Sequence, residues 1–350
     1  MCQSGGKITR RETGAILSVG LGSVPAMTET ADRARAGTAD ETADRQLVHA
    51  RGLTKRFGGF TAVDGIDVDV RRGEAFGFLG PNGAGKSSTM RMIACVSPVT
   101  AGTLRVLGRD PATDGSWIRG RLGVVPQEDS LDLELTVREN LLVYGRYFGL
   151  PKPLIRDRAD ELLDFVQLRE KRDAKVDALS GGMKRRLTIA RSLINEPEVL
   201  LLDEPTTGLD PQARHVLWDR LFRLKQQGVT LILTTHYMDE AEQLCDRLVV
   251  MDKSKIVAEG SPAELIGQWS TREVVEVRFR PDEHEAMAAQ VEDLAGRVEV
   301  LPDRLLLYTD DGDAAAAAIL ERGLHPAGVL VRRSTLEDVF LRLTGRTLVD

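Results

Sequence analysis

Short apolar runs alternate with longer amphipathic segments between residues 47 and 267, and glycine-rich turns lie between them. The short runs favour buried strands, and the longer segments favour helices. Such alternation is typical of a mainly parallel sheet covered by helices. The pattern predicts buried strands at residues 74–79, 123–125, 199–203 and 230–234.

The stretch from about 128 to 195 has a largely helical pattern, which begins at Thr136 with TVRENLLVYGRYFGL. We interpret it as a helical subdomain inserted into the α/β core. The core and its insert together form one predicted domain, residues 47–268.

Residues 271–350 form a second predicted unit, of the α+β class. Alternating apolar positions from Val275 to Phe279 indicate a strand, and a helical run follows over 283–294. Two short strands flank Pro302, and a helix over 313–321 precedes a last strand over 327–331. The order strand-helix-strand-strand-helix-strand predicts a small ferredoxin-like module.

A final helix follows this module. Ser334 and Glu337 fit a capping box at its start. The apolar side chains that share one face of this helix are Leu336, Val339, Phe340 and Leu343.

Composition narrows the class of protein. The chain has 350 residues, a formal charge of −6 and three cysteines without metal-ligand spacing. This charge gives no global basic field, so we expect no nucleic-acid partner. A helix needs about 20 apolar residues to cross a bilayer, and the longest apolar runs are far shorter. Any work at a membrane would therefore go through a partner.

Residues 1–46 are predicted to be a disordered or over-annotated extension. Basic residues before a mildly apolar stretch loosely resemble a signal peptide, but glycines and a proline interrupt that stretch. We expect translation to start at Met27. Residues 28–46 are polar and lack aromatic residues, a composition typical of disorder.

The segment GPNGAGKS fits the P-loop pattern, and it follows an apolar strand and opens a helix. Its glycines let backbone N–H groups face phosphate oxygens, and the helix N-terminus adds positive charge. Lys86 supplies a charge for the β- and γ-phosphates, and the Ser87 hydroxyl is a ligand for Mg²⁺. The expected phosphate-binding residues are Gly80, Pro81, Asn82, Gly83, Ala84, Gly85, Lys86, Ser87 and Ser88.

An apolar strand, VLLL, ends in Asp203 and Glu204. Asp203 fits a residue that holds Mg²⁺ through its hydration shell. Glu204 fits a general base that polarises the attacking water. By itself this pattern also suits a strand that simply reaches solvent. Together with the P-loop, it predicts a nucleoside triphosphatase or kinase.

Ser180, Gly181 and Gly182 precede a helix, and Ser180 lies 23 positions before Asp203. The serine caps that helix, and the glycines leave its first amides open to an anion. In this order and spacing the motifs resemble those of the ABC ATPase family. The resemblance implies ATP and Mg²⁺ as cofactors.

The resemblance assigns further roles. Phe57 lies at the position of an aromatic ring that stacks on adenine, where many members have tyrosine. Gln127 matches the glutamine that senses metal and γ-phosphate, Asp210 matches the D-loop, and His236 matches the switch histidine. The implied catalytic residues are Lys86, Gln127, Glu204 and His236; the implied metal-binding residues are Ser87, Gln127 and Asp203.

The family completes its site with a second chain in a head-to-tail dimer that encloses two ATP molecules. The segments GRYFGL, LSGGMKRRLTIARSLINEP, THYMDEAEQLCDRL and TLEDVFLRLTGR resemble ATPases of daunorubicin-resistance and nodulation-signal exporters. That resemblance implies a separate permease of about six spans in two copies. The chain would sit on the cytoplasmic side of the cell membrane, and multidrug export with antibiotic resistance, or export of a lipid-like molecule, would follow.

Three alternatives remain. An importer subunit has the same motifs, and the C-terminal TLEDVFLRLTG segment and the close resemblance to the exporter subgroup argue against it. A DNA-maintenance ATPase would need a long coiled coil between Gln127 and Ser180, where no long heptad array appears. A ribosome-associated factor would normally carry two cassettes.

Overall fold

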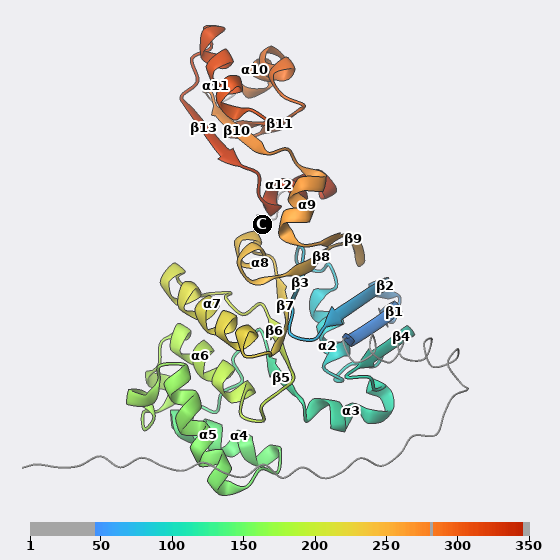
Figure 1. Ribbon diagram of the computed structural model, residues 1–350, viewed down its shortest axis with the longest axis vertical. Helices are drawn as coiled ribbons and strands as arrows, with labels where there is room; N and C mark the ends of the chain where they lie inside the picture. Colours follow the sequence, from blue (N-terminus) through green and yellow to red (C-terminus); the bar gives the residue numbers. More distant parts are fainter. Residues whose placement is uncertain (1–45, 281–282, 346–350) are drawn as a thin grey trace, which may run out of the picture. The chain divides into compact units, whose positions relative to one another are not determined.

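The computed structural model describes residues 46–280 and 283–345 (Figure 1). The predicted extension up to residue 45, including the expected start at Met27, lies outside the described residues, as do residues 346–350. In the described part, no helix combines the length and the apolar character that crossing a membrane requires.

The central sheet has six strands in the order β5-β6-β7-β3-β8-β9, of which the first five are parallel. Strand β9 runs antiparallel to β8. The predicted mainly parallel sheet is confirmed. The strands are β3 (Ala75–Leu79), β5 (Leu122–Val125), β6 (Val199–Asp203), β7 (Thr230–Thr235), β8 (Arg247–Asp252) and β9 (Lys255–Gly260).

A second, antiparallel sheet has the order β2-β1-β4. It consists of β1 (Gln46–Phe57), β2 (Phe60–Arg71) and β4 (Ala101–Val106). Helix α2 (Lys86–Ile93) contacts strands of both sheets. Its Met92 and Ile93 share one buried cluster with Leu53 of β1 and Phe78 of β3. The P-loop, which leads into α2, is therefore anchored in the main core.

Helices α4 (Val137–Tyr147), α5 (Lys152–Phe165) and α6 (Gly181–Ser192) pack on one another around a core of their own (Figure 1). That core includes Leu141, Leu163 and Leu187. Helix α4 begins as predicted, because Thr136 and Glu139 form a capping box. Helix α3 (Pro111–Arg119) precedes β5, and α7 (Pro211–Gln226) follows β6.

The C-terminal sheet is antiparallel with the order β11-β12-β10-β13. The predicted ferredoxin-like order of elements is confirmed. The elements are β10 (Glu273–Arg278), α10 (His284–Val291), β11 (Arg297–Leu301), β12 (Arg304–Thr309), α11 (Gly312–Glu321) and β13 (Gly328–Arg333).

The predicted cap of the last helix, α12 (Leu336–Thr344), was wrong by one residue. The capping box uses Thr335 and Asp338 instead of Ser334 and Glu337. The Ser334 hydroxyl is bonded to that of Ser270 at 2.9 Å. Asp338 accepts the Thr335 N–H at 2.8 Å, and Arg332 also binds its carboxylate.

Helix α12 packs in two directions. Leu336, Val339 and Phe340 join a cluster that also contains side chains of α8 (Met238–Leu244) and α9 (Pro262–Trp269). Leu341 packs instead with Val274 and Tyr308 of the C-terminal sheet. Residues of the predicted 271–350 unit therefore also belong to the core of the preceding one.

Candidate nucleotide site

The loop between β3 and α2 has the geometry of an anion site. Gly83 and Gly85 have φ values of 81° and 105°, which favour glycine. A Cβ at Gly85 would lie 2.4 Å from the Ala62 carbonyl oxygen, so no larger residue fits. Among the described residues, no side chain caps the start of α2. Its first amides and partial positive charge are thus available to phosphate oxygens.

Lys86 is the first residue of α2, its side chain turns back to this loop, and it is 4% exposed. Its Nζ donates to the carbonyl oxygens of Gly80 at 2.6 Å and Pro81 at 3.1 Å. Burial lowers the pKa of Lys86, and the nearby carboxylates of Glu204 and Asp203 oppose that effect. The loop carbonyls and these carboxylates therefore hold a cation at the phosphate-binding position.

Asp203 ends strand β6 beside the loop. Its Oδ1 accepts hydrogen bonds from the Thr234 hydroxyl at 2.5 Å and the Ser87 hydroxyl at 3.1 Å. Two of the three predicted metal-binding residues are therefore adjacent. The third, Gln127, makes its hydrogen bond to Glu204 instead.

Glu204 has a left-handed backbone, with φ 46°. For a residue other than glycine this costs about 1–3 kcal/mol, and such strain is concentrated at functional sites. The Glu204 N–H donates to the Thr234 carbonyl at 3.1 Å, and the residue is 6% exposed. The sharp turn after β6 thus holds a carboxyl group in a buried position.

Four side chains approach this carboxyl group. The Gln127 amide donates to Oε2 at 3.1 Å, and the Thr207 hydroxyl donates to the same atom at 3.2 Å. His236 Nδ1 lies 3.3 Å from Oε1, and Lys86 Nζ lies 3.9 Å from it. The structure therefore brings together all four residues that were predicted to be catalytic. Thr207 had no role assigned from the sequence.

Arg185 of helix α6 was also missed. Its guanidinium donates to the carbonyls of Pro205 at 2.8 Å, Asp203 at 3.0 Å and Glu204 at 3.1 Å, and also to that of Pro126. Burial lowers the pKa of Arg185 overall, although several nearby carboxylates oppose that effect. Arg185 lies three and four positions before buried Thr188 and Ile189. That spacing could have placed it on the buried face.

The signature residues start α6 and do not contribute to the P-loop of their own chain. Ser180 caps the helix, accepting the Met183 N–H at 3.4 Å. An added Cβ at Gly181 would meet no atom within 4 Å, whereas one at Gly182 would lie 3.1 Å from the Ala213 side chain. In the described ranges, no hydrogen bond joins these residues to the P-loop. Ser180 and Gly181 are exposed, and Gly181 faces open space.

Two predicted residues lie at the ends of elements. Asp210 caps α7, since its Oδ1 accepts the Ala213 N–H at 2.9 Å. Phe57 ends β1 and pairs with Phe60 across the hairpin. It is 52% exposed, and Lys55 Nζ lies 4.8 Å from its ring centroid. The Ala62 carbonyl oxygen of the same hairpin lies beside Gly85, so the hairpin that ends in Phe57 borders the P-loop.

These parts define a class: a P-loop ATPase whose buried glutamate meets a glutamine and a histidine, with a separate glycine-rich helix start. Comparison with known families agrees. The family described as "ABC transporter" matches residues 63–207, and "Nodulation factor export protein NodI, C-terminal domain" matches residues 284–345. The chain belongs to the ABC transporter ATPases.

Among curated relatives, the Nod factor export ATP-binding protein I of Ralstonia nicotianae is 49% identical over 308 residues. That alignment covers 87% of this chain and 95% of the relative. A protein of the same name from a Rhizobium species is 48% identical, over 85% of this chain and 96% of the relative.

Solved structures give the same fold. The ADP conformation of MJ1267, an ATP-binding cassette of an ABC transporter, has a TM-score of 0.58 and 26% identity. The match spans 64% of this chain and 94% of the MJ1267 chain. The cbiO1 subunit from Clostridium perfringens, part of the transporter complex cbiONQ, has a TM-score of 0.60 and 26% identity. This match spans 71% of this chain and 97% of the cbiO1 chain.

Proposed function

We propose that this chain is the ATP-hydrolysing subunit of an ABC exporter, and that it works at the cytoplasmic face of the cell membrane with a separate permease. The observation that carries the hydrolysis proposal is the meeting of Lys86, Gln127 and His236 at the carboxyl group of Glu204. A site that only bound nucleotide would not need a buried carboxylate in this position.

We propose that the amides of residues 80–88 and Lys86 hold the phosphates, with the Phe57 ring against adenine. The donor set near Asp203 suits Mg²⁺, because hydroxyl and carboxylate oxygens lie within 3.1 Å of each other. Ser87, Asp203 and Gln127 would hold the ion, which supplies charge neutralisation for the transferred phosphoryl group.

In this proposal Glu204 accepts a proton from the attacking water. Gln127 and Thr207 fix the orientation of its carboxyl group through Oε2. His236 lies beside Oε1 and would contact the γ-phosphate. Arg185 of α6 donates to the backbone carbonyls of Asp203 and Glu204. It thereby fixes the position of the signature helix relative to the base.

The exposed signature supports a two-chain site. Ser180, Gly181 and Gly182 offer helix amides to an anion, and Gly181 faces open space. We propose that they close on the γ-phosphate held by Lys86 of a second copy, with Asp210 at the same interface. Two copies related head to tail would enclose two ATP molecules.

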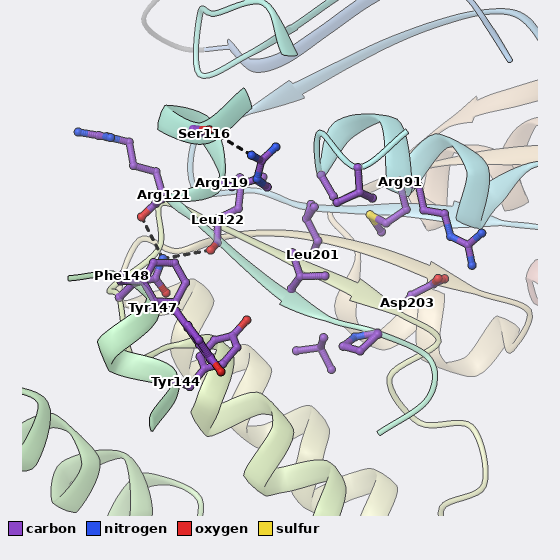
Figure 2. Close-up of a pocket in the computed structure, with 18 of the residues that line it drawn as sticks. Arg91, Ser116, Arg119, Arg121, Leu122, Tyr144, Tyr147, Phe148, Leu201 and Asp203 are labelled. Carbon is purple, nitrogen blue, oxygen red and sulfur yellow. Dashed lines mark hydrogen bonds between the residues drawn. The ribbon is translucent and has the colours of Figure 1, made fainter. Parts of the chain in front are cut away.

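A groove next to Gln127 suits a permease segment. Its volume is about 1040 Å³, and it extends from α2 and α3 to the aromatic end of α4 (Figure 2). Val96 and Tyr147, two of its lining residues, are 66% and 79% exposed. Gln127 and Asp203 also line the groove. A partner held there would therefore touch the residues that sense the nucleotide.

The proposed cargo is based on the names of the similar proteins. Those named above are Nod factor exporters, so we propose export of a lipid-like signal molecule of that kind, and no longer multidrug export or antibiotic resistance. The same names, and the matched C-terminal domain, favour export over import. The permease would have about six spans and be present in two copies.

The test is affinity purification of the Glu204→Gln chain from detergent-solubilised membranes of its host, with partners identified by mass spectrometry. We expect a multi-span permease without a solute-binding protein. Tyr147→Ala in the same background should reduce permease recovery without changing ATP binding, since Tyr147 is exposed. Recovery of a binding-protein-dependent permease, of ribosomes or of DNA would contradict the export proposal.

A further inference from the structure

A buried carboxyl group lies behind the catalytic side chains. Glu240 is in the first turn of α8, four positions after His236, and it is 0% exposed. Acidic side chains are almost never fully buried unless they are paired or carry no charge. No role for Glu240 follows from the nucleotide site described above.

Three segments meet at Glu240. The Trp218 ring N–H, from α7, donates to Oε1 at 3.4 Å. The side chains of Thr206 and Thr235 also lie near this carboxyl group. Thr206 follows Glu204 in the turn after β6, and Thr235 precedes His236 at the end of β7. The third segment, α7, is capped by Asp210. Each of the three segments thus carries or adjoins a residue of the proposed site: Glu204, His236 or Asp210.

The Thr235 contact acts directly on the switch histidine. The Thr235 hydroxyl oxygen accepts the Tyr237 N–H at 2.9 Å, which forms the turn that carries His236. That turn holds His236 Nδ1 3.3 Å from Glu204 Oε1. A group that fixes the Thr235 hydroxyl therefore also fixes the distance between His236 and Glu204.

We propose that Glu240 is a positioning residue for ATP hydrolysis, which ties the turn bearing His236 to the turn bearing Glu204 and Asp210. The proposal rests on the roles proposed above for His236 and Glu204. It predicts that the Glu240 carboxyl group acts through its hydrogen bonds rather than through a charge.

The surroundings support a neutral carboxyl group. Burial raises the pKa of Glu240 and outweighs the opposing effect of the polar side chains of Thr235, Thr206 and Trp218. Asp239 raises it further, and the charge of Glu240 is also sensed by Arg185 of α6 and Cys245 after α8. Oε2 of Glu240 and Oγ1 of Thr206 are buried without an aligned partner. A protonated Oε2 can itself donate a hydrogen bond, and it buries no charge.

The test compares Glu240→Gln with Glu240→Ala in the full chain, measuring kcat and KM for ATP. Glutamine keeps the shape and hydrogen bonds of the neutral acid, so kcat should stay near the wild-type value. Alanine should lower kcat about tenfold to a hundredfold with KM unchanged, because His236 is displaced. An alanine variant with wild-type kcat, or a glutamine variant as slow as alanine, would overturn the proposal.

Thr206→Val serves if the alanine variant does not fold, because valine matches threonine in shape and removes only the hydroxyl. It should lower kcat and leave KM unchanged, and an unchanged kcat would overturn the proposal. If the wild-type chain does not hydrolyse ATP at all, the proposed function fails, and the kinetic comparison is then silent for that reason alone.

Unfolding at several pH values tests the neutral carboxyl group independently of activity. Because the folded pKa is raised, the stability from neutral Glu240 is complete below the unfolded glutamate pKa of about 4.3 and is lost as pH rises through the folded value. Glutamine does not lose it. The stability of Glu240→Gln relative to wild type should therefore increase above pH of about 4.3, and a constant difference would contradict a neutral Glu240.

Discussion

The side-chain amide of Gln127 donates a 3.1 Å hydrogen bond to Oε2 of Glu204, although 77 positions separate the two residues. Gln127 follows β5, and Glu204 follows β6, the neighbouring parallel strand. The bond joins the entrance of the helical segment to the proposed base. Movement of α4 to α6 relative to the sheet would therefore change the orientation of the group that activates water.

Glu204→Gln should retain ATP binding and lose at least about a hundredfold in turnover, because the amide cannot accept the proton. The measurement is phosphate release alongside equilibrium ATP binding. Glu198→Gln is the matched control, since Glu198 lies just before the same strand in a surface ion pair with Arg72. Turnover by Glu204→Gln equal to that of the control would rule out Glu204 as the base.

Lys86→Ala should abolish measurable nucleotide binding rather than turnover alone, because the loop loses its only buried ammonium group within the described residues. Fluorescent-nucleotide titration measures this directly. Lys255→Ala, at an exposed lysine paired with Asp64, should bind normally. Normal binding with slow hydrolysis in Lys86→Ala would restrict Lys86 to the chemical step.

Gly181→Ala should leave folding unchanged and reduce ATP hydrolysis about tenfold or more, since a Cβ there meets nothing within 4 Å in its own chain. Alanine also favours the helix start over glycine. The clash would arise only against the second copy's nucleotide. Thermal unfolding and turnover, measured together, separate the two effects; full activity would contradict the proposed interface.

Asp338→Asn should lower the free energy of unfolding by about 1–3 kcal/mol, because Arg332 and Tyr308 lose a charged partner. Burial alone would raise the pKa of Asp338, but the hydrogen bonds and charge of Arg332 lower it overall. The wild-type advantage is therefore complete above the unfolded pKa of about 3.9 and is lost as pH falls through the lower folded value. Urea unfolding at several pH values measures this; an advantage that persists at lower pH would contradict the ion pair.

Much of the fold follows from local patterns. The buried strand at 199–203 was predicted with its observed bounds, because an apolar run between turns has few alternatives. The cap of α12 was misplaced, because Ser334 and Thr335 fit equally well locally. The choice depends on Ser270, which lies 64 positions before Ser334 and binds its hydroxyl.

The residues of the site also fall into two groups, those that local sequence motifs predict and those that only the folded structure brings together. Lys86, Asp203 and Ser87 lie in motifs whose spacing can be recognised along the chain. Arg185 and Thr207 act through contacts with the turn at Glu204, and their neighbours Arg186 and Thr206 are the same residue types. The left-handed backbone of Glu204 also has no local signal. These features depend on how distant strands are brought together.

The central claim is that two copies of this chain share each ATP. It is tested most directly by the mass in solution of purified Glu204→Gln, measured by sedimentation with and without Mg²⁺ and ATP. We expect monomers without nucleotide, and dimers that hold two ATP molecules in its presence. A chain that stays monomeric at saturating ATP, while the wild type hydrolyses ATP at a rate per chain independent of protein concentration, would contradict the account.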